Sequence, residues 1–94
     1  MEVSDILEER GSRYGSFADN ARDTQLAYAL FTRDEMPKEI KEAIHMICHK
    51  LARVRHGDCM YADNFVDIAG YAELAARWIK DQNIENPQGS VRRI

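Results

Sequence analysis

The chain has 94 residues, and its 13 Lys and Arg against 16 Asp and Glu give a net charge of -3. This length fits one domain, and the lack of a cationic excess argues against non-specific binding to nucleic acid. A hydrophobic fraction of 45% with 31% charged residues indicates a folded chain. Because we find no signal peptide, no apolar run of membrane-spanning length and no disulfide framework, we expect a cytoplasmic protein.

Two helices are expected in the first third of the chain. The first runs from Val3 to Arg10, and Gly11 ends it. The segment from Gly11 to Ser16 is expected to be a plain turn, although a loop with two glycines could also cradle a phosphate. Ser16 is a good N-cap for a second helix that runs to about Thr32.

Two longer helices follow. Pro37 suits the first position of a helix that continues to His56, where Gly57 ends it. After a short turn, Asp63 is expected to cap the last helix, which fades near Gln82.

Both long helices carry apolar residues at alternating spacings of four and three, which is typical of a packing seam. Helices joined by so short a turn pack antiparallel, and Gly70 inside the second one predicts that another backbone comes close. The predicted fold is therefore all-α, a small helical bundle built on a long antiparallel helical hairpin, with one domain at residues 1–82 and a flexible tail at 83–94. The two seams consist of Ile40, Ile44, Ile47, Leu51 and Val54, and of Phe65, Ile68, Ala72, Ala75 and Ile79.

So short a chain buries only about two thirds of its unfolded surface and is modestly stable alone. We therefore expect a homo-oligomer. The apolar side chains outside the seams that we expect at its subunit interface are Tyr28, Phe31, Leu74 and Trp78.

Unlike polar groups meet near the turn between the two long helices. Arg53 lies one turn before Gly57 and Asp67 one turn after Asp63, so the two side chains are expected to contact each other across the helices. One interpretation is a structural ion pair. The other is a ligand site, because Lys50 and Arg53 suit phosphate oxygens.

In the ligand-site interpretation, Asp67 orients Arg53, and Tyr14 or Tyr71 stacks on a base. Asp63 and Asp67, four residues apart on a helix, could also hold a divalent metal such as magnesium. The predicted ligand-binding residues are Lys50, Arg53, Tyr14, Asp67 and Tyr71.

Three histidines mark the long helix before the turn. His45 and His49 have a spacing compatible with zinc, and His56 lies further along. The alternative is a solvated histidine face or one that lies at an interface.

The runs YGSFADNA, EAIHMICHKLARVRHGD and ADNFVDIAGYAEL resemble a family of small phage and prophage proteins of unknown function, over about residues 6 to 79. The chain is more remotely similar to phage domains associated with nucleotide modification. It is also remotely similar to all-α nucleotide pyrophosphatases of the MazG type, which bind magnesium through paired carboxylates. Lys50 and Arg53 stand where two of those carboxylates would be needed. The matched positions are Tyr14, Gly15, Asn20, Lys50, Arg53, Asp63, Asp67, Gly70 and Tyr71.

These observations lead to three functional hypotheses. The first is a phage-type helical protein in the host cytoplasm that binds a nucleotide or another phosphorylated small molecule. The second is a non-catalytic protein that binds a host or phage protein, with a structural polar cluster. The third is a metal-dependent hydrolase of nucleoside phosphates that uses Asp63 and Asp67.

Overall fold

The protein is described by a computed structural model that covers residues 2–83, so nearly all of the predicted tail lies outside the described residues. Four helices follow one another: α1 (Val3–Tyr14), α2 (Phe17–Phe31), α3 (Lys38–His56) and α4 (Asp63–Gln82). Within residues 2–83 there is no strand, which confirms the all-α class. In this range no helix is both long enough and apolar enough to cross a membrane.

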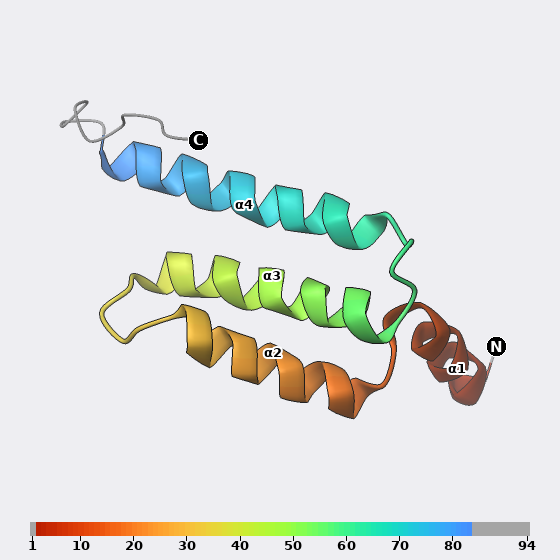
Figure 1. Cartoon of the computed structure of the whole chain (residues 1–94). Helices are drawn as coiled ribbons and strands as arrows, with labels where there is room; N and C mark the ends of the chain where they lie inside the picture. Colours follow the sequence, from red (N-terminus) through yellow and green to blue (C-terminus); the bar gives the residue numbers. More distant parts are fainter. Residues whose placement is uncertain (1, 84–94) are drawn as a thin grey trace.

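The helix α3 is the centre of the molecule. Figure 1 shows α2 along one flank of α3 and α4 along the other, while α1 projects from the end of the layer where α3 finishes. The three long helices therefore form one layer, with α3 in the middle and with two broad faces.

The first helix is longer than predicted. It continues through Gly11 and ends at Tyr14, and the Gly15 N–H donates to the Gly11 carbonyl at 2.8 Å. The prediction that Gly11 ends the helix was wrong, because the backbone reversal happens at Gly15, whose φ is 84°. That left-handed value is where glycine is favoured over other residues.

The caps of the other helices match the prediction in part. The Asp19 N–H donates to the Ser16 hydroxyl at 3.3 Å, which confirms Ser16 as the cap of α2. The Gly57 N–H donates to the Arg53 carbonyl at 2.9 Å at the end of α3. Asp63 does not cap α4, because Ala62 occupies the cap position, and the Asp63 carboxylate lies in the first turn, where it favours the helix dipole.

A close backbone contact fixes the end of α1 against the end of α3. The Asp58 N–H donates to the Arg13 carbonyl at 2.9 Å. A Cβ atom on Gly15 would collide with the His56 backbone, and one on Gly57 would collide with the Arg13 carbonyl. The two glycines therefore allow a contact that holds Tyr14 beside the last turns of α3.

The core of the layer is small. The buried apolar residues among those described are Ala43, Cys48 and Ala52, whose small side chains let the neighbouring helices approach α3. Cys48 is a free thiol, and burial raises its pKa. The predicted seam of α3 is not part of this core, because its members are half-buried and Leu51 is 45% exposed.

Apart from Ala75, the residues of the two seams lie on one outer face of the layer instead of filling the space between α3 and α4. Successive residues of a helix point about 100° apart, so residues two apart point to nearly opposite sides. Leu51 follows His49 by two residues, and Phe65 precedes Asp67 by two. We call the side that carries Arg53, His49 and Asp67 the pocket face. The opposite side, which we call the apolar face, carries Leu26 and Leu30 of α2, Ile40, Ile44, Ile47, Leu51 and Val54 of α3, and Phe65, Ile68, Ala72 and Ile79 of α4.

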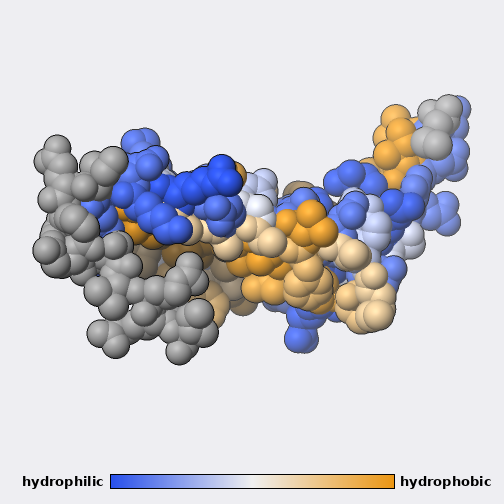
Figure 2. All heavy atoms as spheres, turned by 90° about the horizontal axis from the view of Figure 1, so that it is seen from above, coloured by the Kyte–Doolittle hydropathy of each residue, from blue (hydrophilic) through white to orange (hydrophobic). Residues whose placement is uncertain are grey.

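Figure 2 views the layer edge-on from the side of α4, and apolar atoms gather there around the middle of the view. The seam prediction therefore identified residues that share a side. It was wrong about what covers most of them, because Leu51, Phe65 and Ile79 stay exposed. Ala75 of the α4 seam is the exception, since it lines a hollow between α3 and α4 together with Ala43.

Gly70 has no neighbour where one was predicted. A Cβ atom built there would have no heavy atom within 4 Å, so no backbone of the described chain comes close. We expect Gly70→Ala to raise the free energy of unfolding by about 0.5–1 kcal/mol, because alanine loses less backbone entropy inside a helix. Gly57→Ala is expected to lower it, because the added methyl group meets the Arg13 carbonyl.

Urea unfolding of both variants checks this pair, with Gly11→Ala as a second site where the added Cβ would meet nothing within 4 Å. A destabilised Gly70→Ala protein would mean that another chain approaches α4 at this position.

Candidate ligand-binding site

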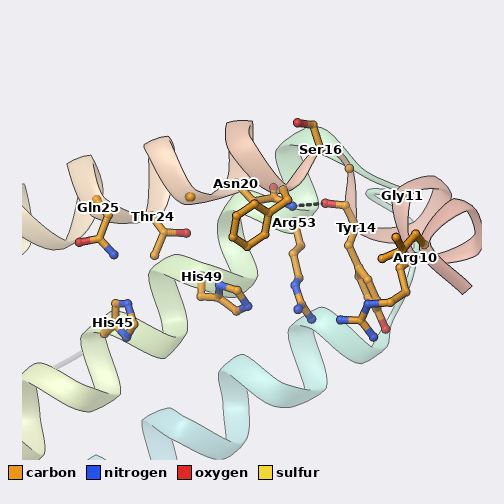
Figure 3. A pocket seen from close by; sticks show the side chains of 14 residues that line it. Arg10, Gly11, Tyr14, Ser16, Asn20, Thr24, Gln25, His45, His49 and Arg53 are labelled. Carbon is orange, nitrogen blue, oxygen red and sulfur yellow. Dashed lines mark hydrogen bonds between the residues drawn. The ribbon is translucent and has the colours of Figure 1, made fainter. Parts of the chain in front are cut away.

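A hollow of about 490 Å³ lies on the pocket face, between the end of α1, the first part of α2 and the stretch of α3 from His45 to Arg53. Figure 3 shows side chains from these three helices converging on it. The polar and aromatic residues that line it are Arg10 and Tyr14 of α1, Ser16 before α2, Phe17, Asn20, Thr24 and Gln25 of α2, and His45, His49 and Arg53 of α3.

Two cations lie beside the Tyr14 ring. The guanidinium carbon of Arg53 is 4.2 Å from the centroid of that ring, and the guanidinium carbon of Arg10 is 5.1 Å from it. Such contacts hold an arginine over an aromatic ring without neutralising its charge. Within residues 2–83, neither arginine forms a salt bridge. The hollow therefore carries two positive charges that an anion can neutralise.

The α2 wall of the hollow has polar atoms with unused hydrogen-bonding capacity. Asn20 is 7% exposed and Thr24 is 3% exposed. The Asn20 Nδ2 donates to the Tyr14 carbonyl at 2.5 Å, a bond that ties α2 to the end of α1 (Figure 3). Among the described residues, Asn20 Oδ1 and the Thr24 hydroxyl have no hydrogen-bond partner. Buried polar groups rarely stay unpaired, so these two atoms suit a ligand or an ordered water.

The histidines on the α3 wall lie close together without forming a metal site. Burial lowers the pKa of His49, and the positive charges of Arg53, Lys50 and His45 lower it further, so the ring is neutral near pH 7. His45 packs edge-on against Tyr28, with ring centroids 5.4 Å apart. In the described part of the chain, no three His, Cys, Asp or Glu side chains come together as a metal site. His45 with His49, or Asp63 with Asp67, would thus supply two ligands each.

The five predicted ligand-binding residues are divided among three places. Tyr14 and Arg53 line the hollow. Tyr71 lies in a second hollow of about 570 Å³ on the same face, where Leu74 and Trp78 of α4 meet the first turns of α3.

Lys50 and Asp67 instead contact each other, with the Lys50 Nζ 2.9 Å from the Asp67 Oδ2. The predicted Arg53–Asp67 contact was wrong, because Asp67 binds Lys50 and Arg53 lies over Tyr14. The Lys50 side chain is 13% exposed and that of Asp67 46%. This pair therefore connects α3 to α4 and leaves Lys50 neutralised.

A second ion-pair cluster, which the sequence analysis missed, joins α2 to the end of α3. The His56 Nε2 lies 2.6 Å from the Asp23 Oδ2. Arg22 and Arg55 also contact this carboxylate. The pKa of Asp23 is lowered by Arg22 first and then by His56. Arg10, Thr24 and Gln25 were also missed as lining residues, because their convergence depends on how α1 and α2 pack against α3.

These features define an all-α protein whose single layer of helices carries a basic pocket on one face. Residues 2–79 match a family model described as "Domain of unknown function (DUF6378)". The chain belongs to this family. Searches of curated proteins and of solved structures found no match.

Removing Asp67 tests the contact between α3 and α4. Asp67→Ala leaves the mostly buried Lys50 ammonium without its partner, and we expect a loss of about 1–2 kcal/mol in the free energy of unfolding, between the values for exposed and buried pairs. The matched control is Glu73→Ala, which removes an exposed pair within α4 and is expected to cost a few tenths of a kcal/mol. Equal effects in urea unfolding would show that Lys50 reaches water once Asp67 is removed.

The pKa of His49 makes stability depend on pH. Because the pKa is lower in the folded chain than its ordinary value of 6.5, the unfolded chain binds more protons as the pH falls below about 6.5. We therefore expect the free energy of unfolding to fall over that range. His49→Asn is expected to lose part of this decrease when urea unfolding is compared at pH 7.5 and 5.5. An identical pH dependence in both proteins would contradict the lowered pKa.

Proposed function

We propose that the hollow beside Tyr14 binds a nucleotide or another phosphorylated small molecule. The observation that carries this proposal is the pair of arginines, Arg10 and Arg53, which lie beside one aromatic ring and form no salt bridge within residues 2–83. Elsewhere on the described surface the usual arrangement is a paired arginine. Guanidinium groups bind phosphate oxygens through two parallel hydrogen bonds, so the part of the hollow beside Arg10 and Arg53 suits a phosphate.

The rest of the hollow supports a ligand that also has a neutral polar part. Its volume of about 490 Å³ lies within the range of roughly 300–1,000 Å³ that is usual for small-molecule sites. Asn20 Oδ1 accepts a hydrogen bond, the Thr24 hydroxyl donates or accepts one, and neutral His49 does both. A base or sugar would pair with these groups, while the phosphate lies on the arginines.

Tyr14 has a different role from the simple stacking platform inferred from sequence. Arg53 lies over its ring, so a base stacks there only when Arg53 turns toward the phosphate. Lys50 and Asp67 satisfy each other and take no part in this proposed site.

The phage origin, the cytoplasmic setting and the homo-oligomer inferred from sequence remain part of this proposal. The runner-up is a non-catalytic protein that binds a host or phage protein, and the exposed apolar face favours it. Metal-dependent hydrolysis has weaker support. The carboxylates assigned to it, Asp63 and Asp67, do not line the basic hollow, and Asp67 is already paired with Lys50.

Ligand-dependent melting tests the proposal. We expect nucleoside mono-, di- or triphosphates to raise the melting temperature of the wild-type protein, because a ligand that binds the folded state stabilises it, by about 2.7 kcal/mol at a hundredfold excess over Kd. Arg53→Gln is expected to lose most of this shift. Arg77→Gln removes an exposed arginine that is paired with Glu73 on α4, and it is expected to keep the shift.

Two further arms separate the alternatives. Inorganic phosphate alone shows whether the anion or the whole nucleotide is recognised, and turnover that requires magnesium would move support to the hydrolase. If no nucleotide shifts the melting temperature of the wild-type protein, the proposed ligand class is wrong and the interaction-protein hypothesis takes its place.

A further inference from the structure

The apolar face is unusually rich in exposed large side chains for so small a domain. Leu51 of α3 is 45% exposed, and Phe65 and Ile79 of α4 are 52% and 44% exposed. On α2, Leu26 is 65% exposed and Leu30 is 75% exposed. Isolated surface leucines need no explanation, whereas a contiguous patch marks a contact surface.

The rest of the chain cannot compensate for this exposure. Folded domains depend on buried apolar surface to offset the entropy lost on ordering the backbone. Here the buried apolar residues among those described are two alanines and one cysteine. A partner on the apolar face is therefore needed for the fold itself, and it must be present wherever the chain is present.

We propose that this partner is a second copy of the same chain, packed face to face on the apolar face. A second copy is present wherever the chain is made, as the fold requires of its partner. The α3 strip of the face also repeats at spacings of four and three from Ile40 to Val54, the pattern with which one helix packs against an equivalent helix. In a two-fold dimer, the same strip on each chain serves as both contact surfaces.

The size of the face fits such a dimer. The 19 residues of α3 span roughly 28 Å at 1.5 Å per residue. Three helices side by side, with axes 8–10 Å apart, make a layer about 27 Å wide. The face thus measures on the order of 750 Å², close to the roughly 800 Å² per partner in a stable interface.

The chemistry of the strip is also compatible with self-association. Ile40, Ile44, Ile47, Leu51 and Val54 carry no charge. Identical chains that meet there do not place like charges opposite each other, which would oppose association.

The proposed interface differs from the one inferred from sequence. Tyr28 packs against His45 of the same chain. Leu74 and Trp78 line the second hollow on the pocket face. The dimer therefore covers the apolar face and leaves both hollows of each chain open. Association and ligand binding use opposite sides of α3, so a variant of the hollow can lose ligand binding while the dimer remains.

The first experiment uses the wild-type chain. We expect sedimentation equilibrium to give twice the mass of one 10.8 kDa chain. We also expect the melting temperature to rise with chain concentration over a hundredfold range, because unfolding then separates two chains. A mass of one chain with a melting temperature independent of concentration overturns the proposal. Co-purification with a different protein in place of a second copy also overturns it.

Two matched variants identify the face. Leu51→Glu puts a charge on the apolar face, and Leu74→Glu puts the same charge on an exposed leucine of the pocket face. We expect Leu51→Glu to weaken association at least tenfold, and Leu74→Glu to keep the mass of two chains.

Loss of helical circular dichroism together with loss of the dimer is also expected for Leu51→Glu, since a lone chain has little core. A Leu51→Glu protein that stays dimeric overturns the assignment of the face. If Leu74→Glu dissociates the dimer and Leu51→Glu does not, the assignment of the face is also overturned, and the interface lies on the pocket face.

Discussion

The structure depends on α3 being shared by two neighbours at once. One flank of α3 packs against α2 and the other against α4, and both contacts are close because Ala43, Cys48 and Ala52 are small. A helix that is covered on two opposite flanks keeps two uncovered sides. In this chain one of those sides is polar and carries His49 and Arg53, and the other is apolar and carries Leu51. The functional organisation follows from this division, because a layer of single-helix thickness has no interior in which to bury either side.

The basic hollow depends on the contact between the ends of α1 and α3. Without a Cβ on Gly15 and Gly57, the two backbones approach closely enough for the Asp58 N–H to reach the Arg13 carbonyl. That contact holds Tyr14 next to Arg53, and the Asn20 amide then secures the Tyr14 carbonyl from α2. The consecutive helices α1 and α2 and the distant α3 meet at one aromatic residue, and the two arginines that accompany it stay free of carboxylates within the described chain.

Local features of the sequence were predictable because they rest on local interactions. Four helices, the Ser16 cap and the end of α3 at Gly57 follow from periodicity and capping chemistry. The end of α1 was missed because a helix tolerates Gly11, and the contact at Gly15 depends on a distant segment. The partner of Asp67 was missed for a geometric reason. Lys50 and Arg53 are three residues apart and differ by about 60° around the helix, which is enough to turn one toward α4 and the other toward Tyr14.

A repeat of apolar residues predicts which side chains share a side of a helix, but it does not predict what covers that side. The seams of α3 and α4 illustrate this, since the same residues would serve a hairpin core or an outer contact equally well. The position of the polar side chains indicates which side of each helix faces the neighbouring helix. Lys50 and Asp67 meet between the two helices, and this contact turns the seams outward together. The ion pair between α3 and α4 thus orients two surfaces. The seams then share the apolar face, and closing that face would stabilise α3, the helix that supplies His49 and Arg53 to the hollow.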